Sequence, residues 1–228
     1  NDFNIYVVSY DTNSNIWSEP SYVSNSHTTT DTHYYPSMAV DSSGYFYIAY
    51  GAHSTPLYYR KSSSAGNISS WGSETQIASI ASYPRILIDT NDKIYIFYRS
   101  NNASNNQASY KFITSTDSGL TWSDETIILN NGNSDWVYVG GIAMDNSNPS
   151  KIHIAFSWKI GTEIAYVQYI KSLDGGTTWK KADGTSLSLP VTEATADTIT
   201  ADNYKTVWDL NIDSSGNPWI LWNDYYST

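Results

Sequence analysis

Two histidines and one tyrosine are the residues of this chain best suited to proton transfer. His33 precedes and His53 follows a predicted hairpin whose turn runs from Asp41 to Tyr45. Positions 33 and 53 lie equally far from the centre of that turn, so a regular register places the two imidazoles opposite each other. Tyr98 ends the second strand of the next predicted hairpin. Histidine can act as a base or donor near neutral pH, and a tyrosine hydroxyl can protonate a leaving group.

Cations and aromatic rings are predicted on the same face. Arg99 follows Tyr98, Lys111 begins the next strand, and the third hairpin supplies aromatic side chains as stacking walls. This set suits removal of the proton beside a uronate carboxylate, because the developing enolate needs cations or donors and the leaving oxygen needs an acid. We predict His33, Tyr98 and His53 as catalytic residues, Arg99, Lys111, Tyr138 and Trp158 as substrate-binding residues, and neither a metal ligand nor a cofactor.

Each of these residues also has a structural interpretation. A histidine or tyrosine at a strand end is most often a half-buried amphipathic side chain, and only the coincidence of three on one face favours function. Trp158 fits a core position as well as a sugar platform. His153 and His27 are assigned structural or neutral roles. A structural calcium ion is left open by the sequence.

The elements that must position these residues repeat along the chain. Four segments consist of an apolar strand, an aspartate, a polar turn and a second strand; the aspartates are Asp41, Asp89, Asp145 and Asp213, separated by 48, 56 and 68 residues. This period approaches the roughly 40 to 50 residues of a four-stranded propeller blade. No segment shows sustained helical periodicity. Further strands are predicted at residues 5–10, 16–23, 57–62, 74–79, 108–115, 125–129, 164–172 and 186–191.

Two turns carry a more specific motif. Ser115–Trp122 and Ser172–Trp179 both read S-x-D-x-G-x-x-W, and they resemble the Asp-box, or BNR, repeats of sialidase-like propellers. The resemblance implies an all-β propeller of four-stranded antiparallel blades in which Asp117 and Asp174 stabilise turns and do not catalyse. We expect residues 1–228 to form one domain of about four blades, the first and last partial. An incomplete ring or a fragment of a larger propeller is favoured over a small closed ring.

A narrower resemblance involves the candidate site. Asp31–Ser37, Tyr50–Tyr59 and Ser172–Gly184 are similar to the BNR-4 type of propeller, which includes ulvan lyases. In that family a histidine and a tyrosine carry out β-elimination next to a uronic acid, while a second histidine and an arginine hold the carboxylate. By position the resemblance implies these roles for His33, His53 and Tyr98. The arginine has two candidates, Arg99 and Lys111, and a lysine lacks the bidentate fork.

Composition excludes several classes of function. The 228 residues contain no cysteine and four histidines, which excludes disulfide and thiolate chemistry and disfavours a histidine-built metal cage. The net charge of −10 disfavours nucleic acid, and no apolar run approaches the roughly 20 residues that span a bilayer. A start without methionine suggests a processed or excised chain. The abundance of Ser, Thr, Asn and Tyr favours an extracellular or cell-surface protein.

Three functions are therefore compared. The leading hypothesis is an extracellular lyase that cleaves a uronate-containing, ulvan-like glycan, with an acidic polysaccharide as partner. The alternative is a non-catalytic glycan-binding or surface-assembly module, associated with further propeller blades or a larger assembly. A sialidase-type hydrolase is disfavoured, since that chemistry uses three arginines from separated blades and the arginines here, Arg60, Arg85 and Arg99, all lie within one stretch.

Overall fold

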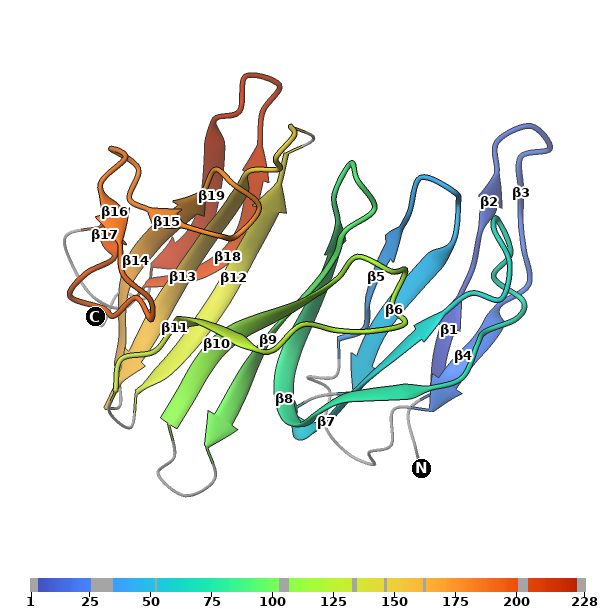
Figure 1. The fold of residues 1–228 in the computed structure, drawn as a ribbon, viewed down its shortest axis with the longest axis horizontal. Coiled ribbons are helices and arrows are strands. Elements are labelled where there is room, and N and C mark those ends of the chain that lie inside the picture. The colour runs from blue at the N-terminus through green and yellow to red at the C-terminus, as the bar shows by residue number, and fades with distance from the viewer. Residues whose placement is uncertain are drawn as a thin grey trace. The chain divides into compact units, whose positions relative to one another are not determined.

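The computed structural model describes residues 4–25, 35–51, 53–102, 107–132, 135–145, 147–161, 163–200 and 205–224. Every regular element in these ranges is a β-strand (Figure 1), which confirms the all-β prediction. Within the same ranges no helix is long and apolar enough to cross a membrane. The chain divides into two compact units: residues 1–88, 92–98 and 114–122 form the first, and residues 89–91, 99–113 and 123–228 form the second. The prediction of one domain of about four blades stays a prediction.

The four repeated hairpins are all present. Each repeat aspartate follows the first strand of its hairpin, and its Oδ1 accepts a hydrogen bond of 2.9 to 3.1 Å from the backbone amide two residues later. This bond closes the turn locally, which is why an aspartate recurs there. The hairpins are β5 (Ser37–Val40) with β6 (Phe46–Gly51), β8 (Thr75–Ile88) with β9 (Ile94–Asn102), β12 (Trp136–Met144) with β13 (Ile152–Ile160), and β18 (Lys205–Ile212) with β19 (Pro218–Asp224).

The first unit contains the candidate residue His53. Strands β5, β6, β7 (His53–Lys61) and β8 pair antiparallel in chain order. The predicted strand at 74–79 and the first strand of the second repeated hairpin form one continuous strand, β8. The predicted strands at 5–10 and 16–23 are divided into four: β1 (Asn4–Val7) pairs with β4 (Ser21–Asn25), and β2 (Tyr10–Asp11) pairs with β3 (Ile16–Trp17).

The second unit is built around the third hairpin. β12, β13, β14 (Glu163–Ser172), β15 (Trp179–Lys180) and β16 (Ser186–Leu187) pair in chain order, and β17 (Asp197–Thr198) pairs with β14. The predicted strand at 186–191 is thus shortened to β16. β10 (Gln107–Ser115) pairs with β11 (Thr126–Leu129). β9 and β10 each carry residues of both units.

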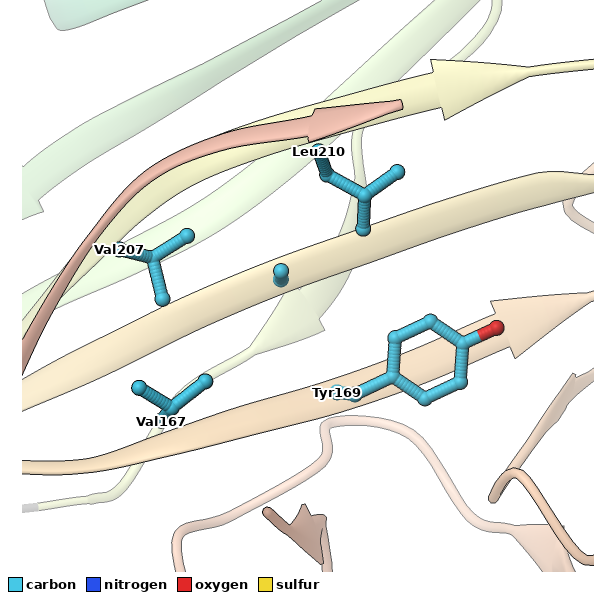
Figure 2. Close-up of a cluster of buried hydrophobic side chains, with 5 residues drawn as sticks. Val167, Tyr169, Val207 and Leu210 are labelled. Atoms are coloured by element: carbon cyan, nitrogen blue, oxygen red, sulfur yellow. The ribbon is translucent and has the colours of Figure 1, made fainter. Parts of the chain in front are cut away.

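Two glycines allow β18 to pack closely on β12. A Cβ atom added at Gly140 would overlap the carbonyl oxygen of Val207, and one at Gly141 would overlap Leu210. Val207 and Leu210 join Val167 and Tyr169 in a buried cluster (Figure 2). The Gly140–Gly141 pair therefore brings the apolar side of β18 into the core of the second unit.

The two S-x-D-x-G-x-x-W turns have the same internal hydrogen bonds. The serine hydroxyl donates a hydrogen bond to the aspartate at 2.7 to 2.8 Å. It accepts one at 2.8 to 2.9 Å from the backbone amide of the motif glycine, four residues after the serine. The aspartate accepts the amide four residues later at 2.8 to 2.9 Å. The Thr121 hydroxyl and amide lower the pKa of Asp117 to about 2. These bonds confirm the prediction that Asp117 and Asp174 stabilise turns.

Candidate functional site

His53 follows the hairpin of β5 and β6, as predicted. The register around Ser43 is confirmed as far as the pair Ser37 and Ala49. β6 ends at Gly51, whose φ is +81°, and His53 begins β7, where it lies opposite Ser82 of β8. The predicted partner, His33, lies outside the described residues, so the pairing of the two imidazoles stays a prediction.

The His53 ring contacts Tyr83. The Tyr83 hydroxyl is 3.2 Å from His53 Nε2, and the two ring centroids are 5.4 Å apart. Both side chains are half-buried. Composition and spacing did not single out this pair. A half-buried imidazole hydrogen-bonded to a phenol can accept, donate or relay a proton.

The backbone around this pair is strained. Ser54, which follows His53, and Tyr83, which follows Ser82, both have positive φ, at 60° and 55°. A left-handed conformation is uncommon for a bulky residue and is found at sites where the surroundings impose it. The Ser82 hydroxyl, which is fully buried, accepts the Ser54 amide at 2.9 Å. The β7–β8 ladder is also irregular here, with register shifts on both sides of Thr55.

Tyr98 is placed in the interior. Its exposed fraction is 0%. A phenol without exposed surface must be uncovered before it can protonate the leaving oxygen of a polysaccharide. The catalytic role of Tyr98 therefore stays a prediction.

Arg99 is held between two aromatic rings of β12. Its guanidinium carbon is 4.8 Å from the ring centroid of Trp136 and 4.8 Å from that of Tyr138. Arg99 is 2% exposed, so this cation–π arrangement is largely removed from water. Cation–π contacts are stronger when they are desolvated. The rings predicted to stack on a sugar thus stack on the guanidinium, and the substrate-binding roles of Arg99 and Tyr138 stay predictions.

The remaining two candidates in the second unit have protein partners. Lys111 Nζ forms an ion pair of 2.7 Å with Glu125. A substrate carboxylate would have to compete with that side chain. Trp158 is 0% exposed and its indole nitrogen donates to Gln168 at 2.8 Å. This burial favours the core position for Trp158 over the sugar platform.

The third described feature of the second unit is a buried histidine. His153 is 3% exposed and its Nδ1 lies 2.6 Å from the Tyr169 hydroxyl. Burial lowers its pKa, and the buried contact with Tyr169 fits the structural role predicted for it. Among the described residues no group of three or more His, Cys, Asp or Glu could hold a metal ion.

Comparison with known proteins places this fold. The chain is 26% identical over 229 aligned residues to an ulvan lyase from Alteromonas sp. (strain LOR), covering 85% of this chain and 47% of that protein. It is 23% identical to an ulvan lyase from Nonlabens ulvanivorans, covering 83% of this chain and 47% of that protein. The chain thus spans about half the length of these curated relatives.

Solved structures show the same fold. The structure of a family 25 polysaccharide lyase, an ulvan lyase bound to -[GlcA(1-4)Rha3S]-, superposes with a TM-score of 0.81 at 20% identity, covering 96% of this chain and 59% of that one. A microbial sialidase superposes with a TM-score of 0.54 at 14% identity, covering 77% of this chain and 39% of that one. The fold is therefore the sialidase-like β-propeller that the repeats predicted. A profile of the BNR repeat-containing family matches residues 1–228, and the chain belongs to that family.

Proposed function

We propose that this chain is part of a polysaccharide lyase that cleaves a uronate-containing glycan by β-elimination. The observation that carries the proposal is the similarity to ulvan lyases along 85% of the chain at 26% identity. The half-buried imidazole of His53 supports it, since an imidazole can accept or donate the proton that β-elimination moves. A uronate-rich, ulvan-like polysaccharide is the substrate class, and an extracellular location follows from that substrate.

The chemistry asks for three contributions from the protein. A base takes the proton beside the uronate carboxylate, the electrons of that C–H bond form a carbon–carbon double bond, and the glycosidic oxygen leaves with a proton from an acid. A cation or hydrogen-bond donor stabilises the charge that builds on the carboxylate. We assign proton transfer to His53 together with His33 and Tyr98, and charge stabilisation to Arg99 or Lys111.

The decisive experiment follows bond cleavage directly. The purified chain is incubated with ulvan, and the ultraviolet absorbance of the unsaturated product is recorded. Cleavage by the native chain and its loss in His53→Ala, with the unfolding transition unchanged, is the expected result. Tyr45→Phe is the control, because Tyr45 lies at the Asp41 turn and its ring contacts Lys61. A folded native chain that releases no unsaturated product would rule the proposal out.

A glycan-binding module is the second candidate. It is favoured by one set of observations: Tyr98 is fully buried, Arg99 is stacked between rings and Lys111 is ion-paired. A module of this kind would retain ulvan in a binding assay, would release no product, and would bind equally well as His53→Ala. A sialidase-type site is disfavoured further, because Arg60 donates to the Val23 carbonyl at 2.7 Å.

A further inference from the structure

One polar contact in the first unit joins two strands at a point where both depart from regular β geometry. His53 and Ser82 are directly opposed on β7 and β8, and the residue after each of them has a positive φ. The two departures face each other across one ladder. Beside them, the Tyr83 hydroxyl lies 3.2 Å from His53 Nε2.

This conformation has a cost, and the folded chain compensates for it locally. A bulky aromatic residue in the left-handed region is destabilised relative to the β region, and such residues persist where neighbouring contacts determine them. Here Ser82 Oγ binds the Ser54 amide at 2.9 Å, and Thr55 Oγ1 accepts the His53 amide at 3.3 Å. Two side chains thus fix the backbone on either side of the imidazole. A residue with only a packing role would need neither the strain nor the directed hydroxyl.

We propose that Tyr83 is a positioning residue for His53, setting the orientation and proton placement of the imidazole through the bond to Nε2. This inference deepens the proposed lyase function and rests on it for the catalytic consequence. A phenol hydroxyl at one ring nitrogen ties the protonation of that nitrogen to the phenol and restricts the rotation of the ring. Misplacement of a catalytic group by about 1 Å can cost on the order of a hundredfold in rate.

The test removes one oxygen atom and keeps the ring. Tyr83→Phe retains the stacking against His53, whose centroid is 5.4 Å away, and deletes only the hydroxyl. Tyr45→Phe is the matched control, since it makes the same change at the Asp41 turn. Imidazole nitrogen chemical shifts are measured by NMR for the native chain and both variants, with His53→Ala used to assign the His53 signals. The turnover number and KM on ulvan are measured in parallel.

The two measurements separate the positioning role from the lyase function. We expect the Nε2 signal of His53 to move in Tyr83→Phe and to stay in place in Tyr45→Phe, and we expect kcat to fall about tenfold to a hundredfold with little change in KM. An unmoved Nε2 signal in Tyr83→Phe overturns the positioning role, whatever the activity. A moved signal with native kcat overturns its catalytic consequence. A native chain without lyase activity overturns the proposed function alone, because the NMR comparison requires no substrate.

Discussion

Gly140 provides a direct test of how the last hairpin packs on the third. A Cβ atom at this position would overlap the Val207 carbonyl oxygen and approach the Trp208 amide at 2.9 Å. Both atoms belong to the backbone of β18, so no side-chain rotation can relieve the overlap. Gly140→Ala therefore forces β12 and β18 apart, or displaces one of them along its length.

The size of the effect follows from two competing terms. Gly→Ala at an ordinary φ stabilises a protein by about 0.4 to 1 kcal/mol, because the unfolded chain loses conformational freedom. Overpacking a tight interior costs about 1 to 3 kcal/mol. Complete release of β18 would expose Val207 and Leu210, each 3% exposed, at about 1.5 to 3 kcal/mol per side chain, so a local shift is the cheaper response. We expect Gly140→Ala to lower the free energy of unfolding by about 1 to 3 kcal/mol.

Equilibrium unfolding in urea measures this loss. Gly72→Ala is the control, because its added Cβ would lie 3.3 Å from the nearest atom, the Lys61 carbonyl oxygen, and we expect a change below about 1 kcal/mol. The double variant Gly140→Ala/Val207→Ala should recover no stability relative to Val207→Ala alone, since the overlap is with backbone. A Gly140→Ala chain as stable as the native one would refute the close approach of β18 to β12.

Three further outcomes are expected. Burial raises the pKa of Asp145, but the hydrogen bonds of its turn lower it to about 2, below the ordinary aspartate value of 3.8. The stabilisation that Asp145 provides is therefore complete above about pH 4 and is lost as the pH falls through about 2, and Asp145→Asn should remove that part of the acid dependence in urea titrations at stepped pH. Arg99→Lys should lower the melting temperature through about 1 to 2 kcal/mol of lost cation–π stacking, with exposed Arg85→Lys neutral; equal melting temperatures would contradict the stacking geometry. Trp158→Phe should lower the free energy of unfolding by about 2 to 4 kcal/mol, since it leaves a cavity and removes the indole N–H that donates to the Gln168 side chain. A urea midpoint within error of the native one would contradict the buried position of Trp158.

The parts of the fold that sequence predicts here are those stabilised within a few residues. Asp41, Asp89, Asp145 and Asp213 each bind an amide two residues along, so the turn and its requirement for aspartate are visible in the chain itself. The register beside such a turn is equally local. The start of β7 at His53 is harder to predict, because it depends on a single positive φ at Gly51 that the composition of that segment does not require.

Burial was harder to predict, for a reason that concerns the architecture. Alternation of apolar and polar residues reports which face of a strand is buried, but it requires one face to meet water. In β13 the seven residues from Ile152 to Trp158 are all buried, because both faces of the strand are covered. The sequence pattern of such a strand does not distinguish a tryptophan in the core from one that binds a ligand. The same ambiguity applies to Tyr98.

The residues that identify the family and the residues that would carry its chemistry are energetically separate. Asp117 and Asp174 close turns through bonds to their own octets, and those bonds involve none of the candidate site residues. A chain could keep every such turn and the propeller fold while losing the imidazole at position 53, and it could keep that imidazole while losing one of the turns. Family membership therefore predicts the fold of this chain more securely than its reaction. The strained contact between His53 and Tyr83 is different, because a turn-stabilising role does not require it, and a variant that lacks one oxygen atom there tests function without testing the fold.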